Sequence, residues 1–216
     1  MPVSLNQILE MPNAAILAEK IRRALEKEKA ERGRFYEIVD ENKKMEFING
    51  EIIFHSPVKL EHNSATKLLC GLLNAHVIKN NSGFVGIEKI LVSLTRNDYE
   101  PDICFFGREK SEKFERGQMR FPAPDLAIEV LSKSTAEKDR AVKFLDYAAH
   151  GVGEYWIIDA DNETIEQYFL RGEEEYELLL KAKDGTITSI VLPDFKIQIR
   201  AVFDERTNLE ELKRLI

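Results

Sequence analysis

The segment PAPDLAIEVLSKSTAEKDRAVKFLDYAAHGVGEYWIID, residues 122–159, predicts a strand, a helix and a second strand in succession. Residues 125–131 (DLAIEVL) alternate in hydrophobicity after two prolines, which is typical of a strand. The S-x-x-E pattern at residues 134–137 is a capping box that opens a helix to about His150. EYWIID follows at residues 154–159 as the second strand. This succession indicates an α/β protein.

The N-terminal residues predict a charged amphipathic helix over 13–32. Asn13 is a plausible N-cap and Gly33 a plausible end of the helix. Its stripe could pack on the body of the protein or on a second subunit, and packing on the body is the default. The stripe consists of apolar residues at helical spacing: Ile16, Leu17, Ile21, Ala24 and Leu25.

Between these two regions the sequence predicts more strands and one further helix. FYEIVDE and MEFINGEIIF (35–41 and 45–54) read as two short strands or a hairpin, with a tight turn at Asn49 and Gly50. Residues 60–79 are helical, and 83–94 form one strand. Further strands are expected at 101–107, 164–170, 176–181 and 186–192. A charged loop is expected at 108–121 and a last helix from Asn208.

Composition places the chain among intracellular globular proteins. The sequence has 216 residues, 44% of them hydrophobic, and no apolar run near the roughly 20 residues that span a bilayer. Cys70 and Cys104 lie in apolar stretches without metal-ligand spacing, which favours reduced thiols in the cytoplasm. The net charge of −7 counts against a nucleic-acid substrate without excluding one, because a basic rim can coexist with an acidic metal site.

Two acidic residues carry the chemical argument. If PDICFF and DLAIEVL are neighbouring antiparallel strands, Asp102 near the start of the first lies beside Glu129 near the end of the second. Glu129 stands between Ile128 and Val130, where an ionised carboxylate is costly without a cation or a proton. Two carboxylates that converge with no basic residue between them suit a hard cation such as Mg²⁺.

A purely structural interpretation stays open for both residues. Asp102 follows Pro101 and could be the first residue of a strand or part of a turn. Glu129 could be salt-bridged or face solvent.

Several stretches together resemble the Uma2 family of the PD-(D/E)XK nuclease superfamily. This resemblance implies a restriction endonuclease-like core over 35–203, an α/β (α+β) fold with a mixed central β-sheet flanked by helices. A helical extension over 1–34 would precede it and a helix over 204–216 would follow. The stretches are MEFINGEII (45–53), EHNSATKLL (61–69), EPDICFF (100–106), PAPDLAIEVLSKST (122–135), KDRAVKFLDYAAHGVGEYWIID (138–159) and LPDFKIQI (192–199).

The resemblance also implies roles for individual residues. Asp102 matches the family's PD element and Glu129 its second acidic position, both as ligands of Mg²⁺ or Mn²⁺. Glu51 matches an acidic residue near the start of the domain and would bind a second ion, unless it is an exposed strand residue.

The superfamily's lysine, two residues after Glu129, is replaced here by Leu131. The resemblance implies that Lys143 on the following helix supplies this charge, although an i,i+4 salt bridge to Asp139 on a solvated face is the alternative. His62, in the first turn of its helix, would contact substrate phosphate or cap the helix.

Three functions follow from these observations. The first is a metal-dependent endonuclease that hydrolyses DNA phosphodiester bonds, as a possible homodimer, since one active site cuts one strand. The second is an inactive nuclease-fold protein used for binding or assembly. The third, a glycosidase, needs a sugar cleft with an aromatic platform that the sequence does not supply.

Overall fold

A six-stranded mixed sheet forms the centre of the computed structural model, which describes residues 4–40, 42–132, 135–172 and 175–216. The sheet order is β11 (Glu175–Ala182), β10 (Thr164–Arg171), β9 (Glu154–Asp159), β8 (Leu126–Val130), β6 (Ile103–Gly107) and β3 (Gly83–Ile87). Strands β8 and β9 are parallel and are connected through helices α5 (Ala136–Arg140) and α6 (Val142–Ala149), whereas the other neighbours are antiparallel. The expected mixed central sheet is confirmed.

A second sheet of five short strands lies against the first. The order is β2 (Glu51–Phe54), β1 (Met45–Ile48), β5 (Asp98–Tyr99), β4 (Leu91–Ser93) and β7 (Arg120–Phe121). The Asn49–Gly50 turn joins β1 and β2 in the predicted hairpin, and both residues have positive φ. The single strand predicted over 83–94 is wrong: its two ends, β3 and β4, belong to different sheets.

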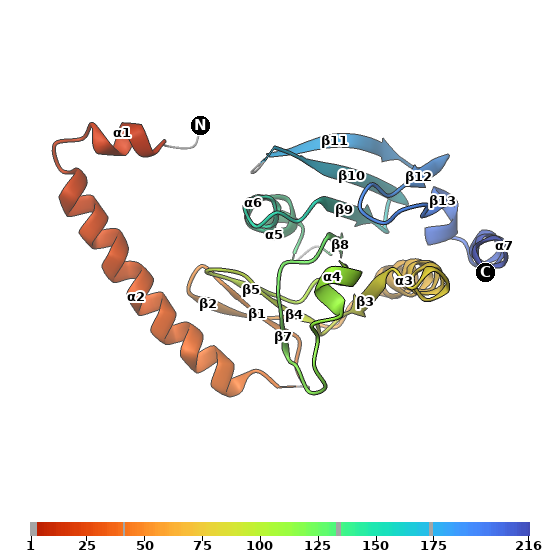
Figure 1. Ribbon diagram of the computed structural model, residues 1–216, viewed down its shortest axis with the longest axis horizontal. Helices are drawn as coiled ribbons and strands as arrows, with labels where there is room; N and C mark the ends of the chain where they lie inside the picture. Colours follow the sequence, from red (N-terminus) through yellow and green to blue (C-terminus); the bar gives the residue numbers. More distant parts are fainter. Residues whose placement is uncertain (1–3, 41, 133–134, 173–174) are drawn as a thin grey trace.

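The two faces of the central sheet are covered by different elements. Helices α3 (Leu60–Asn80) and α7 (Glu205–Leu215) pack on one face, together with the ribbon of β12 (Thr186–Thr188) and β13 (Lys196–Gln198) and the 3₁₀ turn η1 (Ile199–Val202). Helix α6 and the second sheet pack on the other face, where Tyr147, Val152 and Tyr155 are fully buried. The short helix α4 (Arg108–Ser111) follows β6 directly and lies near β3 (Figure 1).

The N-terminal helix differs from its prediction. Helix α2 runs from Ala14 to Ile38 and passes through Gly33, so FYEIVDE begins as helix rather than strand. Phe35 on its last turns is fully buried, and this contact with the body overrides the local β-propensity.

The apolar stripe of α2 does not pack on the body, so the default expectation is wrong for it. Ile16 is 61% exposed, and Ile21 and Leu25 are also exposed. Helix α2 extends away from the two sheets and carries α1 (Leu5–Leu9) at its far end (Figure 1).

The boundaries of the expected regions fall differently from the elements. Residue 34 lies inside α2, and α7 begins at Glu205 with Asp204 as its N-cap. The predicted capping serine, Ser134, lies outside the described residues, and the helix after it is interrupted at Ala141. In the part of the chain described, no helix is long and apolar enough to cross a membrane.

Candidate active site

Strands β6 and β8 place Asp102 beside Glu129. The antiparallel pair Ile103–Ile128 fixes the register, so the next residues outward, Asp102 and Glu129, lie opposite each other on one face. The Val130 N–H donates to Asp102 Oδ2 at 2.8 Å, which ties the two strand ends together. Both acidic side chains are buried. The geometric expectation from the sequence is confirmed, whereas the metal-ligand roles stay predictions.

Asp102 and Glu129 line the same cleft of about 400 Å³. Residues 55–59, which connect β2 to α3, form part of its wall, and residues 159–162, at the end of β9 and just beyond it, form another part. The cleft therefore gives small molecules and ions access to the end of the central sheet where the carboxylates meet.

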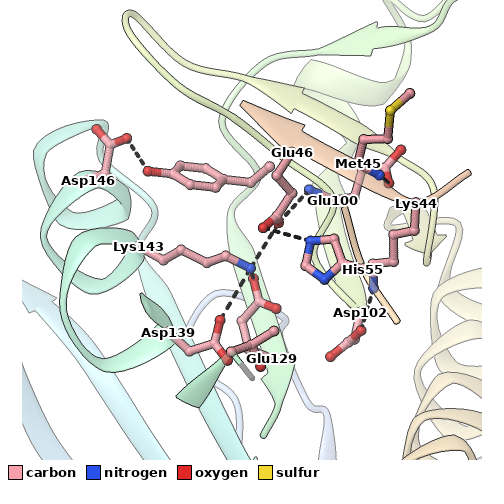
Figure 2. Close-up of polar contacts among 12 residues, drawn as sticks. Lys44, Met45, Glu46, His55, Glu100, Asp102, Glu129, Asp139, Lys143 and Asp146 are labelled. Atoms are coloured by element: carbon pink, nitrogen blue, oxygen red, sulfur yellow. Dashed lines mark hydrogen bonds and ion pairs between the residues drawn. The ribbon is translucent and has the colours of Figure 1, made fainter. Parts of the chain in front are cut away.

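Lys143, which α6 carries, points into this group of carboxylates (Figure 2). Its Nζ lies 2.9 Å from Glu46 Oε1, 3.0 Å from Glu129 Oε1 and 3.2 Å from Asp139 Oδ1. Burial by itself would lower the pKa of the Lys143 ammonium, but the three carboxylates outweigh it and raise that pKa well above its ordinary value. The i,i+4 contact with Asp139 exists, yet it is on a buried face rather than a solvated one.

The acidic residue contributed by the β1–β2 hairpin is Glu46, and Glu51 does not join the cluster. Glu51 is exposed at the start of β2, whereas Glu46 is fully buried in β1. Glu46 contacts Lys143 and also His55, whose Nε2 lies 3.0 Å from Glu46 Oε2. The sequence did carry a signal: Glu46 stands among apolar strand residues, as Glu129 does.

A second lysine, Lys44, pairs with Asp102. The expectation that no basic residue lies between the carboxylates is therefore wrong. Lys44 Nζ is 2.7 Å from Asp102 Oδ1 and 3.2 Å from Glu88 Oε2 (Figure 2 shows the contact with Asp102). His62, in the first turn of α3, is buried with Nε2 3.5 Å from Asp102 Oδ1. Sequence reasoning missed Lys44 and Glu88. Glu88 lies in the connection between β3 and β4, inside what the alternation predicted as one strand.

The pKa shifts reflect how many donors each carboxylate has. Burial raises the pKa of Glu129 well above its ordinary value despite Lys143, and Asp139 and Asp102 add to the rise. Burial acts against ionisation of Glu46 too, but Lys143 and His55 lower its pKa to about 2. The Glu100 N–H donates a further hydrogen bond to Glu46, at 2.9 Å.

Two further carboxyls have shifted pKa values. Burial raises the pKa of Glu100 to about 7. Burial would also raise the pKa of Asp102, but His62 and Lys44 outweigh it and lower that pKa. Tyr147 is fully buried and donates its hydroxyl to Glu129 Oε1 at 3.2 Å.

The cluster fits a divalent cation. Two lysines face a larger set of acidic residues: Glu46, Glu88, Glu100, Asp102, Glu129 and Asp139. His62 adds a buried imidazole, neither nitrogen of which has a hydrogen-bond partner among the described residues. Carboxylates in excess over ammonium groups, next to an unused imidazole, form the donor set that divalent ions need.

Comparisons with known proteins bear on the family and the fold of the chain. The family model Uma2, described as "Putative restriction endonuclease", matches residues 33–200. A crystal structure of a "putative nuclease belonging to DUF820" from Anabaena variabilis ATCC 29413 superposes with a TM-score of 0.67 and 21% identity. The match covers 82% of this chain and 96% of that chain, and it shows a common fold. No curated protein matches the sequence.

Proposed function

The chain belongs to the Uma2 family, and from this membership we propose that it is a metal-dependent endonuclease that hydrolyses DNA phosphodiester bonds. The observation that carries the proposal is the meeting of Asp102 and Glu129 at one end of antiparallel strands, inside a cleft. A carboxylate pair at the end of a sheet suits phosphodiester hydrolysis, which needs charge neutralisation at the phosphate and an activated water.

Asp102 and Glu129 would hold Mg²⁺ or Mn²⁺. When bound, such an ion lowers the pKa of a coordinated water and neutralises charge on the phosphate. The fit rests on the excess of carboxylates over lysines around the cleft and on the high pKa of Glu129, which calls for a proton or a cation at that position.

The protein's own residues would orient the carboxylates. Lys143 contacts three acidic groups and is 1% exposed, so it fixes Glu129 and Glu46 in place. In this role it replaces the lysine that the superfamily carries two residues after Glu129. Tyr147 supports the same Glu129 oxygen through its hydroxyl. Contact of Lys143 with the attacking water stays a prediction.

DNA is the proposed partner, and Lys59 is the group offered to its phosphates, while contact of the buried His62 with a phosphate stays a prediction. Both line the cleft, and Lys59 Nζ pairs with Asp161 at the exposed rim. With a net charge of −7, binding depends on such local cations, so affinity should fall steeply with salt. Action as a homodimer, in the cytoplasm, stays a prediction.

The proposal is tested by incubating supercoiled, linear and single-stranded DNA with the protein in Mg²⁺ or Mn²⁺. We expect cleavage that EDTA stops and that Asp102→Asn and Glu129→Gln abolish while both variants stay folded. Lys67→Met, on the exposed face of α3, is the matched control and should cut like the parent. Equal cleavage by parent and Asp102→Asn would refute the proposal.

One observation favours the second candidate, a nuclease-fold protein that binds without cutting. Each principal carboxylate already has an internal cation, Lys44 on Asp102 and Lys143 on Glu129. A site neutralised in this way needs no metal for stability. Calorimetric titration with Mn²⁺ separates the two candidates, because saturable uptake favours the nuclease and absence of uptake favours the binding protein.

A further inference from the structure

A second group of potential ligands shares Asp102 with the Asp102–Glu129 pair and is otherwise made of different residues. One ligand atom each from His62, Glu88 and Asp102 lies within 4.8 Å of the other two. Glu129 is not part of this group. The three residues come from α3, from the β3–β4 connection and from the start of β6, so three separate elements build the position.

His62 is the observation that points to a ligand. Its side chain is 6% exposed, and neither ring nitrogen makes a hydrogen bond within the described part of the chain. Nε2 points towards Asp102 Oδ1 at 3.5 Å, which is longer than a hydrogen bond. A buried imidazole whose Nδ1 has no hydrogen-bond partner and whose Nε2 has only this long ion pair is poorly compensated for its lost hydration, unless an ion binds to it.

Glu88 is held in place at a conformational cost. Its φ is +58°, a left-handed backbone that glutamate rarely adopts. Its N–H donates to the Asp102 carbonyl oxygen at 2.9 Å, and its carbonyl accepts from Ile90. These two hydrogen bonds fix the Glu88 backbone beside Asp102, and Lys44 Nζ holds the Glu88 carboxylate at 3.2 Å. Strain of this kind persists where the surroundings enforce it, and it concentrates at ligand sites.

Lys44 contacts two of the three residues. Its Nζ binds Asp102 Oδ1 and Glu88 Oε2, the same kind of atoms that a divalent ion would use. Two positive charges at one pair of oxygens repel each other. The ammonium is therefore a built-in competitor for the ion.

We propose that His62, Glu88 and Asp102 form a divalent-cation position with a nitrogen ligand, for which the Lys44 ammonium competes. It deepens the proposed function and rests on it, because it adds an ion position that shares Asp102 with the Asp102–Glu129 pair. An imidazole ligand suits transition ions better than Mg²⁺, so the position selects Mn²⁺ or a similar ion over Mg²⁺. An ion bound there releases Lys44 towards the cleft and the substrate phosphate.

Pulsed EPR of Mn²⁺ bound to protein labelled with ¹⁵N-histidine tests the assignment. We expect a ¹⁵N coupling to bound Mn²⁺ that is lost in His62→Gln and retained in His150→Gln, whose ring lies outside the cleft and contacts Thr95. If Mn²⁺ bound to the parent protein shows no ¹⁵N coupling, the proposal is wrong, and this measurement needs no variant. Persistence of the coupling in His62→Gln overturns it as well.

Affinity measurements test the competition. Lys44→Met should bind Mn²⁺ roughly tenfold more tightly or better, because a positive charge is removed. Lys43→Met, at the neighbouring exposed position, should leave the affinity unchanged. Unchanged or weaker binding by Lys44→Met would disprove the competition.

The outcome is distinguishable from failure of the proposed function. Glu129→Gln should lose cleavage and keep the ¹⁵N coupling, since Glu129 is outside this group. A protein that shows the coupling but never cuts DNA refutes the nuclease alone. A protein that cuts DNA without any coupling refutes the nitrogen-ligand position alone.

Discussion

Replacing Lys143 by methionine should cost the protein a large part of its stability. The three carboxylates around its Nζ, at 2.9, 3.0 and 3.2 Å, are each no more than 3% exposed. A contact near 3 Å is worth about 5 kcal/mol at an effective dielectric constant of about 20. Desolvation offsets much of this, and removing one partner of a buried pair typically costs about 3–5 kcal/mol.

The loss should depend on pH in a defined direction. Burial raises the pKa of Glu129 well above the unfolded value of 4.5 even with Lys143 present, and removal of the ammonium takes away the main group that lowers it. A raised folded-state pKa gives stability that is present below the unfolded pKa and lost as pH rises through the folded one. Lys143→Met should therefore lose more free energy of unfolding at pH 8 than at pH 5.5.

Urea unfolding in EDTA at both pH values measures the effect. Lys67→Met is the control, because Lys67 pairs with Glu205 across 3.3 Å on the surface and should change stability by less than about 0.5 kcal/mol. A loss below about 1 kcal/mol for Lys143→Met at pH 8 would contradict the reasoning, as would a larger loss at pH 5.5 than at pH 8.

Further substitutions test other parts of the structure. Glu46→Gln should lower the rate of DNA cleavage about 10- to 100-fold because Glu46 orients Lys143. Glu51→Gln should leave that rate unchanged. A larger loss of rate in Glu51→Gln than in Glu46→Gln would place Glu51 in the site. Arg32→Met leaves Asp98 buried without its cation and should lower the free energy of unfolding, measured in urea, by about 3 kcal/mol. A loss below about 1 kcal/mol would show that this contact does not anchor α2. Glu100 has a raised pKa of about 7, so its contribution to stability is present below pH 4.5 and is lost as pH rises through about 7. Glu100→Gln should flatten the stability profile in that window, and an unchanged profile would place the titration elsewhere.

Local patterns predicted the central sheet well, because alternation and apolar content coincide there. The strand of Glu129, its antiparallel neighbour and the helix that carries Lys143 lie near the predicted positions. The register then brought Asp102 and Glu129 together, since antiparallel pairing depends only on strand direction and parity. These two residues were within reach of sequence reasoning for that reason.

The remaining site residues depend on contacts that no local pattern encodes. Glu88 reaches the site through a left-handed residue that interrupts an apparently continuous strand. Lys44 approaches Asp102 from 58 residues away in the sequence, across two sheets. Helix α2 continues past Gly33 because Phe35 and Arg32 find partners on the second sheet, which overrides the strand propensity of FYEIV. Tertiary contacts therefore determine where Glu88 and Lys44 lie and where α2 ends.

Anomalous diffraction from a crystal soaked in Mn²⁺ tests the central claim most directly. The account predicts an anomalous peak in the cleft, coordinated by the carboxylates of Asp102 and Glu129. A well-ordered crystal at saturating Mn²⁺ with peaks on the surface and none against either carboxylate would contradict it.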